Sequence, residues 1–193
     1  MSAKSSLDFS EKGFELLDKK RNVLIREMMS YVTKARELQK EVDITFSKAY
    51  KALEAANINS GITDTENRAM SVDEAKDYEI LFKSVMGVEV PSIVFQRKDI
   101  ELNYGIHRGS ATIDDAMKKF NSVKYLTYEL AEVENAIYRL SVEVKKTQKR
   151  ANALQNIQIP KFEEIVKYVT EVLEEKERED FFRLKVVKKK HRK

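Results

Sequence analysis

The side chains that could carry out acid–base, nucleophilic or metal chemistry are few and scattered in this chain of 193 residues. It has no cysteine, which excludes disulfides and thiolate metal sites. Its two histidines, His107 and His191, lie too far apart in sequence to suggest a metal site or an acid–base pair. The pair Asp114–Asp115 falls in the predicted first turn of a helix, where carboxylates complement the helix dipole.

Motifs that bind phosphate or build a catalytic centre do not occur either. The sequence contains no Gly-x-x-x-x-Gly-Lys, no Gly-x-Ser-x-Gly and no His-Glu-x-x-His. We therefore expect a non-catalytic protein that needs no cofactor and no metal.

The basic residues are concentrated at the C-terminus. Residues 183–193 hold seven lysines and arginines and no acid, and subtracting these from the net charge of +4 leaves −3 for residues 1–182. Such a tail could bind nucleic acid or anionic lipid, but it also suits a solvated helix end, where lysine favours the helix dipole. No apolar run approaches the roughly 20 residues that span a bilayer, and the N-terminus lacks a signal-peptide core. We expect a cytosolic chain that meets a membrane only through partners.

The elements that position these residues are predicted to be two long helices. One is predicted from Thr112 to Val187. Within it, from Leu126 to Leu154, apolar residues recur at alternating spacings of four and three, the pattern of a helix packed along its length against another helix. At about 1.5 Å per residue the whole helix would extend on the order of 110 Å. The residues predicted to form this coiled-coil seam are Leu130, Val133, Ile137, Leu140, Val144 and Leu154.

Pro160 interrupts this seam after Leu154. A proline inside a helix usually kinks it. The spacing from Leu154 to Ile165 is a heptad plus four residues, which relaxes the supercoil. We therefore expect a kink at Pro160, placed where it disturbs the seam least.

A second apolar stripe runs from Leu17 to Ala56, interrupted at Arg21. Asp8 and Glu11 have the spacing of a capping box, so this helix is predicted to begin near Asp8, after a frayed start, and to end at the breakers that follow Ala56.

In the middle of the chain the spacing of the apolar residues changes. Ser71 and Glu74 predict the start of a short helix that ends at Gly87. Beyond it, two alternating runs flank the polar turn at 96–98 and predict a β-hairpin. Its alternating apolar residues would be Val88, Val90, Ile100, Leu102 and Tyr104.

The predicted fold class is all-α: a long antiparallel two-helix coiled coil, with a short middle helix and a small β-hairpin. It would be one structural domain with three regions. These are an N-terminal helix at 1–57, a middle foot at 58–110, and a C-terminal helix with a basic tail at 111–193.

Four stretches resemble one known family, the D subunits of the V-type (archaeal A-type) ATPases. KGFELLDKKRNVLIREMM at 12–29 resembles the opening of that family, and SATIDDA at 110–116 resembles the start of its second long helix. NALQNIQIPKFEEI at 152–165 and EREDFFRLK at 177–185 are similar to its closing part. The resemblance covers both ends of the chain and the order of the elements.

The resemblance implies a central-stalk rotor that couples ATP hydrolysis or synthesis to proton or sodium transport. Its paired terminal helices would turn inside the hexamer of catalytic A and regulatory B subunits. The middle region would meet the F subunit of the stalk and the membrane-rotor socket subunit. Nucleic acid would not be a partner. The residues that would then contact the hexamer are Arg21, Lys149, Arg150, Phe181, Phe182, Arg183 and Lys185.

Two alternatives have similar shapes. A free-standing coiled-coil adaptor would use the basic tail to bind nucleic acid or anionic lipid. The gamma shaft of F-type ATPases carries a larger middle domain, for which residues 57–109 are too short.

Overall fold

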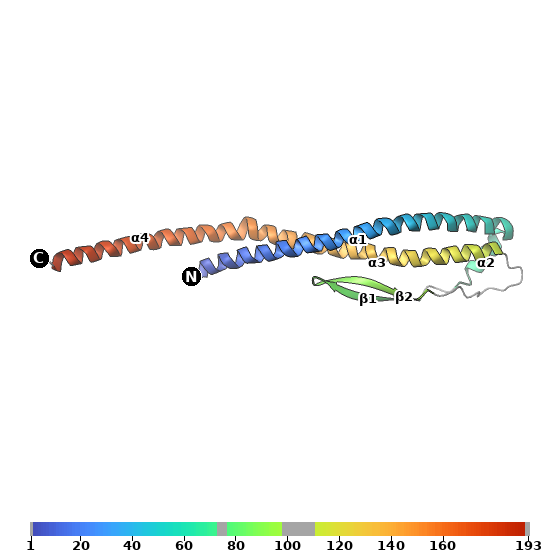
Figure 1. Cartoon of the computed structure of the whole chain (residues 1–193), viewed down its shortest axis with the longest axis horizontal. Coiled ribbons are helices and arrows are strands. Elements are labelled where there is room, and N and C mark those ends of the chain that lie inside the picture. Colours follow the sequence, from blue (N-terminus) through green and yellow to red (C-terminus); the bar gives the residue numbers. More distant parts are fainter. Residues whose placement is uncertain (1, 73–76, 98–110, 192–193) are drawn as a thin grey trace. The chain divides into compact units, whose positions relative to one another are not determined.

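The computed structural model describes residues 2–72, 77–97 and 111–191. Its elements are helix α1 (Ser2–Ser60), the short helix α2 (Ile62–Ala69), strands β1 (Tyr78–Val85) and β2 (Val88–Phe95), helix α3 (Ala111–Ala153), the π-helix η1 (Leu154–Gln158) and helix α4 (Ile159–His191) (Figure 1). The predicted class is confirmed: long N-terminal and C-terminal helices pack together, accompanied by a short helix and a two-stranded antiparallel hairpin.

The chain forms two compact units. The terminal unit consists of Met1–Val23 with Val144–Lys193, and the central unit is Leu24–Glu143. Helices α1 and α3 each contribute residues to both units. The predicted three-region division at 57 and 110 stays a prediction.

In the terminal unit, α1 runs antiparallel to the end of α3 and the start of α4. Gly13 faces Leu154, whose Cδ1 lies 3.6 Å from the position of a Cβ on Gly13, while Arg21 on α1 bonds to Gln148. Small buried side chains line this contact: Ser10, Thr147 and Ala151. Because facing helices have the same rise per residue, the start of α1 lies level with roughly residue 166, and the rest of α4 has no helix from α1 beside it.

In the central unit, α1 and α3 bury a seam of aliphatic residues. At one end, Ala52 and Ala56 pack with Ile113 and Ala116. Next to this cluster, the ring of Tyr50 meets the edge of the Phe120 ring at a centroid distance of 5.6 Å. The other buried apolar side chains of the two helices here are Leu24, Leu38, Val42, Ala49, Val123, Tyr125, Val133, Ala136 and Leu140.

Helix α1 is longer than the sequence pattern predicts. Asp8 lies inside it and pairs with Lys12 at 2.8 Å, one turn along, so the predicted capping box does not begin the helix. The helix ends at Gly61, whose φ of 83° and N–H bond to Asn57 O (3.0 Å) form a glycine stop. The breakers after Ala56 therefore separate two helices, and α2 follows at once.

The helix predicted between Ser71 and Gly87 is wrong, because residues 78–85 form β1. Gly87 is a turn residue of the hairpin and not a helix stop. Met86 and Gly87 both have positive φ (52° and 79°), as in the type I′ turn that joins two right-twisted strands. The register runs from Val85 opposite Val88 to Tyr78 opposite Phe95.

The predicted hairpin is therefore shifted toward the N-terminus. Val88 and Val90 lie on β2, as expected, but their partner strand precedes them. Ile100, Leu102 and Tyr104, predicted as the second strand, lie outside the described residues.

Candidate interaction surfaces

Among the described residues, no group of three or more His, Cys, Asp or Glu side chains could hold a metal ion. Asp115 of the carboxylate pair bonds to Lys119 at 2.6 Å. None of the described helices is sufficiently long and apolar to cross a membrane. The candidate sites are therefore surfaces and contacts between helices.

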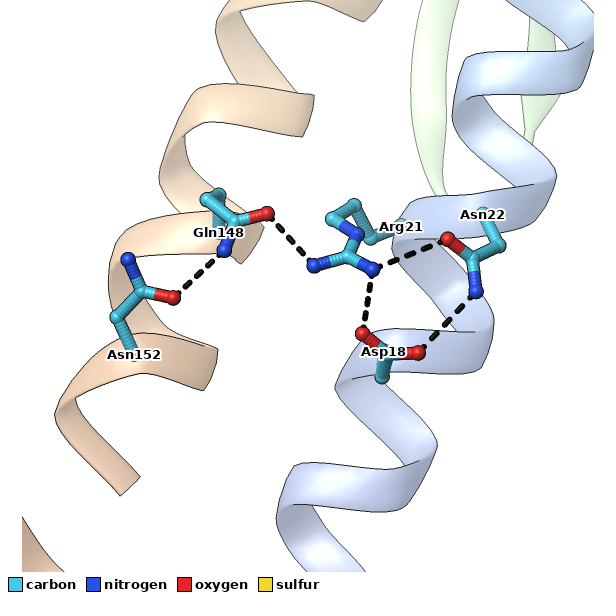
Figure 2. Close-up of polar contacts among 5 residues, drawn as sticks. All are labelled: Asp18, Arg21, Asn22, Gln148 and Asn152. Carbon is cyan, nitrogen blue, oxygen red and sulfur yellow. Dashed lines mark hydrogen bonds and ion pairs between the residues drawn. The ribbon is translucent and has the colours of Figure 1, made fainter. Parts of the chain in front are cut away.

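The first is a polar network across the helix pair of the terminal unit (Figure 2). Arg21 on α1 donates from Nη1 to Gln148 Oε1 on α3 (2.7 Å), and its Nη2 pairs with Asp18 Oδ1 (2.6 Å). Asn22 donates to the other Asp18 oxygen (3.1 Å), and Gln148 donates to Asn152 (2.6 Å).

Arg21 is one of the residues predicted to contact a surrounding hexamer. Its guanidinium instead points toward α3 and its side chain is only 23% exposed, so its hydrogen-bonding capacity is largely used within the chain. One signal of this role is present in the sequence, since Arg21 breaks the apolar stripe. A polar residue at such a position fixes the alignment of two helices, because any slip would leave it unpaired.

The second surface is the end of α4. Its apolar side chains have no covering within the terminal unit: Phe181 and Phe182 are 66% and 65% exposed, and Leu184 is 69% exposed. Between them, Arg183 makes only long ion pairs of 3.7 Å with Glu179 and Asp180. Other exposed apolar residues before and after this group are Tyr168, Val169, Leu173, Val186 and Val187.

The other predicted hexamer contacts also lie on exposed surface. Lys149 and Arg150 are exposed on the last turns of α3, and Lys185 is exposed on α4. The structure thus places six of the seven predicted contact residues at the surface of the terminal unit, with Arg21 as the exception.

The predicted seam residues lie on α3 and at the start of η1. Val133 and Leu140 are completely or almost completely buried, and the other four (Leu130, Ile137, Val144 and Leu154) are half-buried. Ala136 is fully buried beside Ile137. The predicted seam does not include Ala136, whose small side chain is a weak hydrophobic signal.

Pro160 lies in the first turn of α4, directly after the π-helix. The N–H of Ile159 bonds to Leu154 O, five residues back. In a regular α-helix the proline ring would collide with the carbonyl of Asn156 and would supply no N–H. A widened turn just before the proline relieves this conflict while the chain remains helical. The predicted kink stays a prediction.

The third surface is the hairpin, which α3 holds in the central unit. Asp77, just before β1, accepts hydrogen bonds from Lys124 Nζ (2.7 Å), Tyr128 OH (3.1 Å) and Tyr125 OH (3.3 Å). The Lys124 bond keeps the pKa of Asp77 below its ordinary value. Burial, together with Asp77, raises the pKa of Tyr128 to about 12.

Aromatic stacking and a carboxylate complete this attachment. Phe95 on β2 stacks on Tyr125 at a centroid distance of 5.3 Å, and Tyr78 on β1 contacts Tyr128 at 5.2 Å. Glu132 accepts the backbone N–H of Ile93 at 2.8 Å. Sequence reasoning misses this attachment because its partners are separated by 30 to 51 residues and share no motif.

The comparisons with known proteins agree with one another. A family model for the D subunit of ATP synthase matches residues 1–189. The D subunit of the V-type ATP synthase of Thermotoga neapolitana is 43% identical over 187 residues, which is 97% of this chain and 92% of that protein. The D subunit of the A-type ATP synthase is 38% identical in Thermococcus sibiricus and 37% in Pyrococcus horikoshii, in each case over 96% of this chain and 88% of the relative.

Proposed function

Since the chain belongs to the family of ATP synthase D subunits, we propose that it is the central-stalk shaft of a V- or A-type ATPase. Membership makes it a subunit of the complex. The proposal adds that it rotates inside the hexamer of A and B subunits and takes no part in the chemistry of ATP. Its rotation would couple ATP hydrolysis or synthesis to proton or sodium transport, on the cytoplasmic side of a membrane.

The observation that carries the proposal is the uncovered end of α4. Beyond the start of α1, roughly 25 residues of α4 have no helix of α1 beside them. In proteins most helical stability comes from packing of an apolar face, and this segment has no packing partner from α1. Its phenylalanines would also remain in contact with solvent. Both facts are explained if another protein surrounds this segment, as a hexamer would surround a shaft.

The contacts we propose for that segment combine apolar and basic groups. Phe181 and Phe182 would pack against apolar side chains of the hexamer, and Arg183 and Lys185 would meet acidic ones. Lys149 and Arg150 would make similar contacts nearer the π-helix. Single exposed ion pairs contribute about 0–1 kcal/mol, so we expect the aromatic side chains to dominate.

Torque would travel through the long helices. Both α1 and α3 run through the two units without a break, so a turn at one unit is passed on along continuous backbone. The Arg21–Gln148 contact would resist sliding of one helix past the other. In the central unit, the hairpin and α2 would offer surface to the F subunit of the stalk and to the socket of the membrane rotor.

The test begins with purification of the tagged chain from its native cell. We expect A, B and F subunits to come with it, with ATPase activity retained. Recovery of nucleic acid or of unrelated proteins, without ATPase subunits, would contradict the proposal and favour an adaptor.

A paired variant then locates the hexamer contact. Replacing both Phe181 and Phe182 by serine should weaken binding to the A/B hexamer at least tenfold, since exposed aromatic anchors dominate interfaces. Folding should be unaffected because both side chains are already in solvent. The matched control is Tyr138→Ser, which alters an aromatic residue on α3 that is equally exposed (69%).

A further inference from the structure

Among the residues that the structure describes, no strand pairs with the outer edge of β1. Within the described residues, β1 pairs with β2 alone, in a two-stranded sheet. Three consecutive apolar side chains of β1 are about half exposed: Ile80 (51%), Leu81 (47%) and Phe82 (57%). An uncovered apolar edge strand is a template on which another strand can pair.

The outer edge of β2, in contrast, bonds to α3. The Ile93 N–H is taken by Glu132 Oε2 at 2.8 Å, and the Glu89 carbonyl accepts a hydrogen bond from Arg139 at 3.2 Å. The hairpin therefore has one protected edge and one free edge.

The register shows which backbone groups of β1 point outward. Val85 and Val88 flank the two-residue turn and form a hydrogen-bonded pair, after which bonded and non-bonded pairs alternate. Ile80 and Phe82 fall in non-bonded pairs, so their N–H and C=O groups point away from β2. The Ile93 N–H, opposite Ile80, supports this assignment because it also points outward, to Glu132.

The free edge is complementary to itself. If a second copy of β1 pairs antiparallel about Leu81, Ile80 lies opposite Phe82 in a hydrogen-bonded pair. Glu79 then lies opposite Lys83, twice by symmetry, in the non-bonded pairs whose side chains approach most closely. Both charged side chains are exposed.

Neighbouring registers lack this match. Pairing about Phe82 would set Lys83 against Leu81. Pairing about Ile80 would set Glu79 against Leu81 and would offer Lys83 only Asp77, which Lys124 already holds.

We propose that in the free chain the outer edge of β1 is a docking surface for β1 of a second copy. The two hairpins join in a four-stranded antiparallel sheet, with the β1 strands at its centre and Leu81 on the two-fold axis. In this arrangement the outward N–H and C=O groups of Ile80 and Phe82 in both copies form hydrogen bonds. Each Glu79 lies opposite Lys83 of the other copy. This association is independent of any role in the ATPase, and it involves only the unassembled chain.

Sedimentation equilibrium of the purified full-length chain tests the proposal. The wild type should show a reversible monomer–dimer equilibrium. Lys83→Glu places like charges opposite each other twice and should raise the dissociation constant about tenfold or more, as should Glu79→Lys. The double exchange of both residues restores opposite charges and should return the constant close to the wild-type value.

Two further variants separate this edge from other surfaces. Lys51→Glu makes the same charge change on an exposed face of α1 and should leave the equilibrium unchanged. Ile80→Pro removes an outward N–H that β2 does not use, together with the isoleucine side chain, and should abolish the dimer. Pro91 already occupies such a position on β2.

The proposal is overturned if the wild type stays monomeric up to its solubility limit. It is equally overturned by a dimer that Lys83→Glu does not weaken, or by a double exchange that fails to restore binding. None of these results bears on the rotor proposal, because the measurement contains no other component of the ATPase.

Discussion

At the scale of single residues, the interior polar contacts of this chain align its elements. Arg21 connects α1 to α3 through Gln148, and Asp77 connects the start of β1 to the same helix through Lys124. Both contacts are specific in geometry, because their hydrogen bonds form at only one alignment of the elements that they join. Packing of alanine and leucine along a seam would tolerate a slip more easily.

Arg21→Ala should lower the free energy of unfolding by about 1–2 kcal/mol, since it leaves Gln148 and Asp18 without their shared partner. Chemical denaturation measures this loss. Arg26→Ala, which removes an exposed arginine one turn further along α1, is the control and should change stability little. Equal effects of the two substitutions would argue against an aligning role for Arg21.

The hairpin attachment should depend on pH through Asp77. Its pKa in the folded state lies below the unfolded value because of Lys124, so the contact stabilises the hairpin above about pH 4 and is lost as the pH falls through the folded pKa. The protection of the β2 amides against hydrogen exchange, measured relative to the intrinsic exchange rate at each pH, should therefore fall in acid. In Asp77→Asn this protection should be lower at neutral pH and less sensitive to acid.

The ionisation of Tyr128 tests the same contact independently. With its pKa at about 12, it should ionise later than an ordinary tyrosine in an ultraviolet titration. Asp77→Asn should bring it closer to the ordinary value. An unchanged titration would mean that Asp77 does not contact Tyr128 in solution.

At the scale of elements, the long helices could be predicted because a seam repeats the same local signal over many turns. The hairpin could be predicted only in part. Val88 and Val90 show strand alternation, but the run from Tyr78 to Val85 also fits a helical spacing, and Gly87 ends a helix or makes a hairpin turn equally well. Pairing with β2 and attachment to α3 decide between the two, and neither is visible in a local pattern.

Substitutions at seam positions should lower the free energy of unfolding more where the replaced side chain is more deeply buried. Leu140→Ala should reduce the free energy of unfolding by about 2–5 kcal/mol, because Leu140 is fully buried. Ile137→Ala, at a half-buried position, should cost clearly less. Thermal or chemical unfolding of the two variants compares them. A larger loss for Ile137 would mean that the seam faces a different direction.

Pro160→Ala tests the origin of the π-helix. Alanine supplies the missing N–H and removes the ring, so residues 154–158 should return to regular α-helical bonding, and the melting temperature should stay the same or rise. Hydrogen exchange across η1 would detect the change. If folding stays intact but ATPase coupling is lost in the assembled complex, the irregular turn has a mechanical role.

At the scale of the whole molecule, the account rests on one contrast. The seam residues of the helix pairs are buried or half-buried, whereas the end of α4 presents phenylalanine, leucine and valine to solvent. Sequence similarity over nearly the full length makes the chain a subunit of a V- or A-type ATP synthase, and the exposed segment is where we expect that complex to hold it. The sequence indicates part of this, because the first predicted helix is shorter than the second and can cover only part of it. It does not mark the end of α4 as the exposed part, because the same apolar spacing would also suit a covered helix.

The most direct test of the central claim is to watch the chain turn. It has no cysteine, so a cysteine introduced at the exposed Lys48 of α1 would be a unique site for a visible probe. In a complex reconstituted with A, B and F subunits and fixed through the hexamer, addition of ATP should drive rotation of the probe in one direction. A hexamer that hydrolyses ATP while the probe stays still would contradict the rotor account.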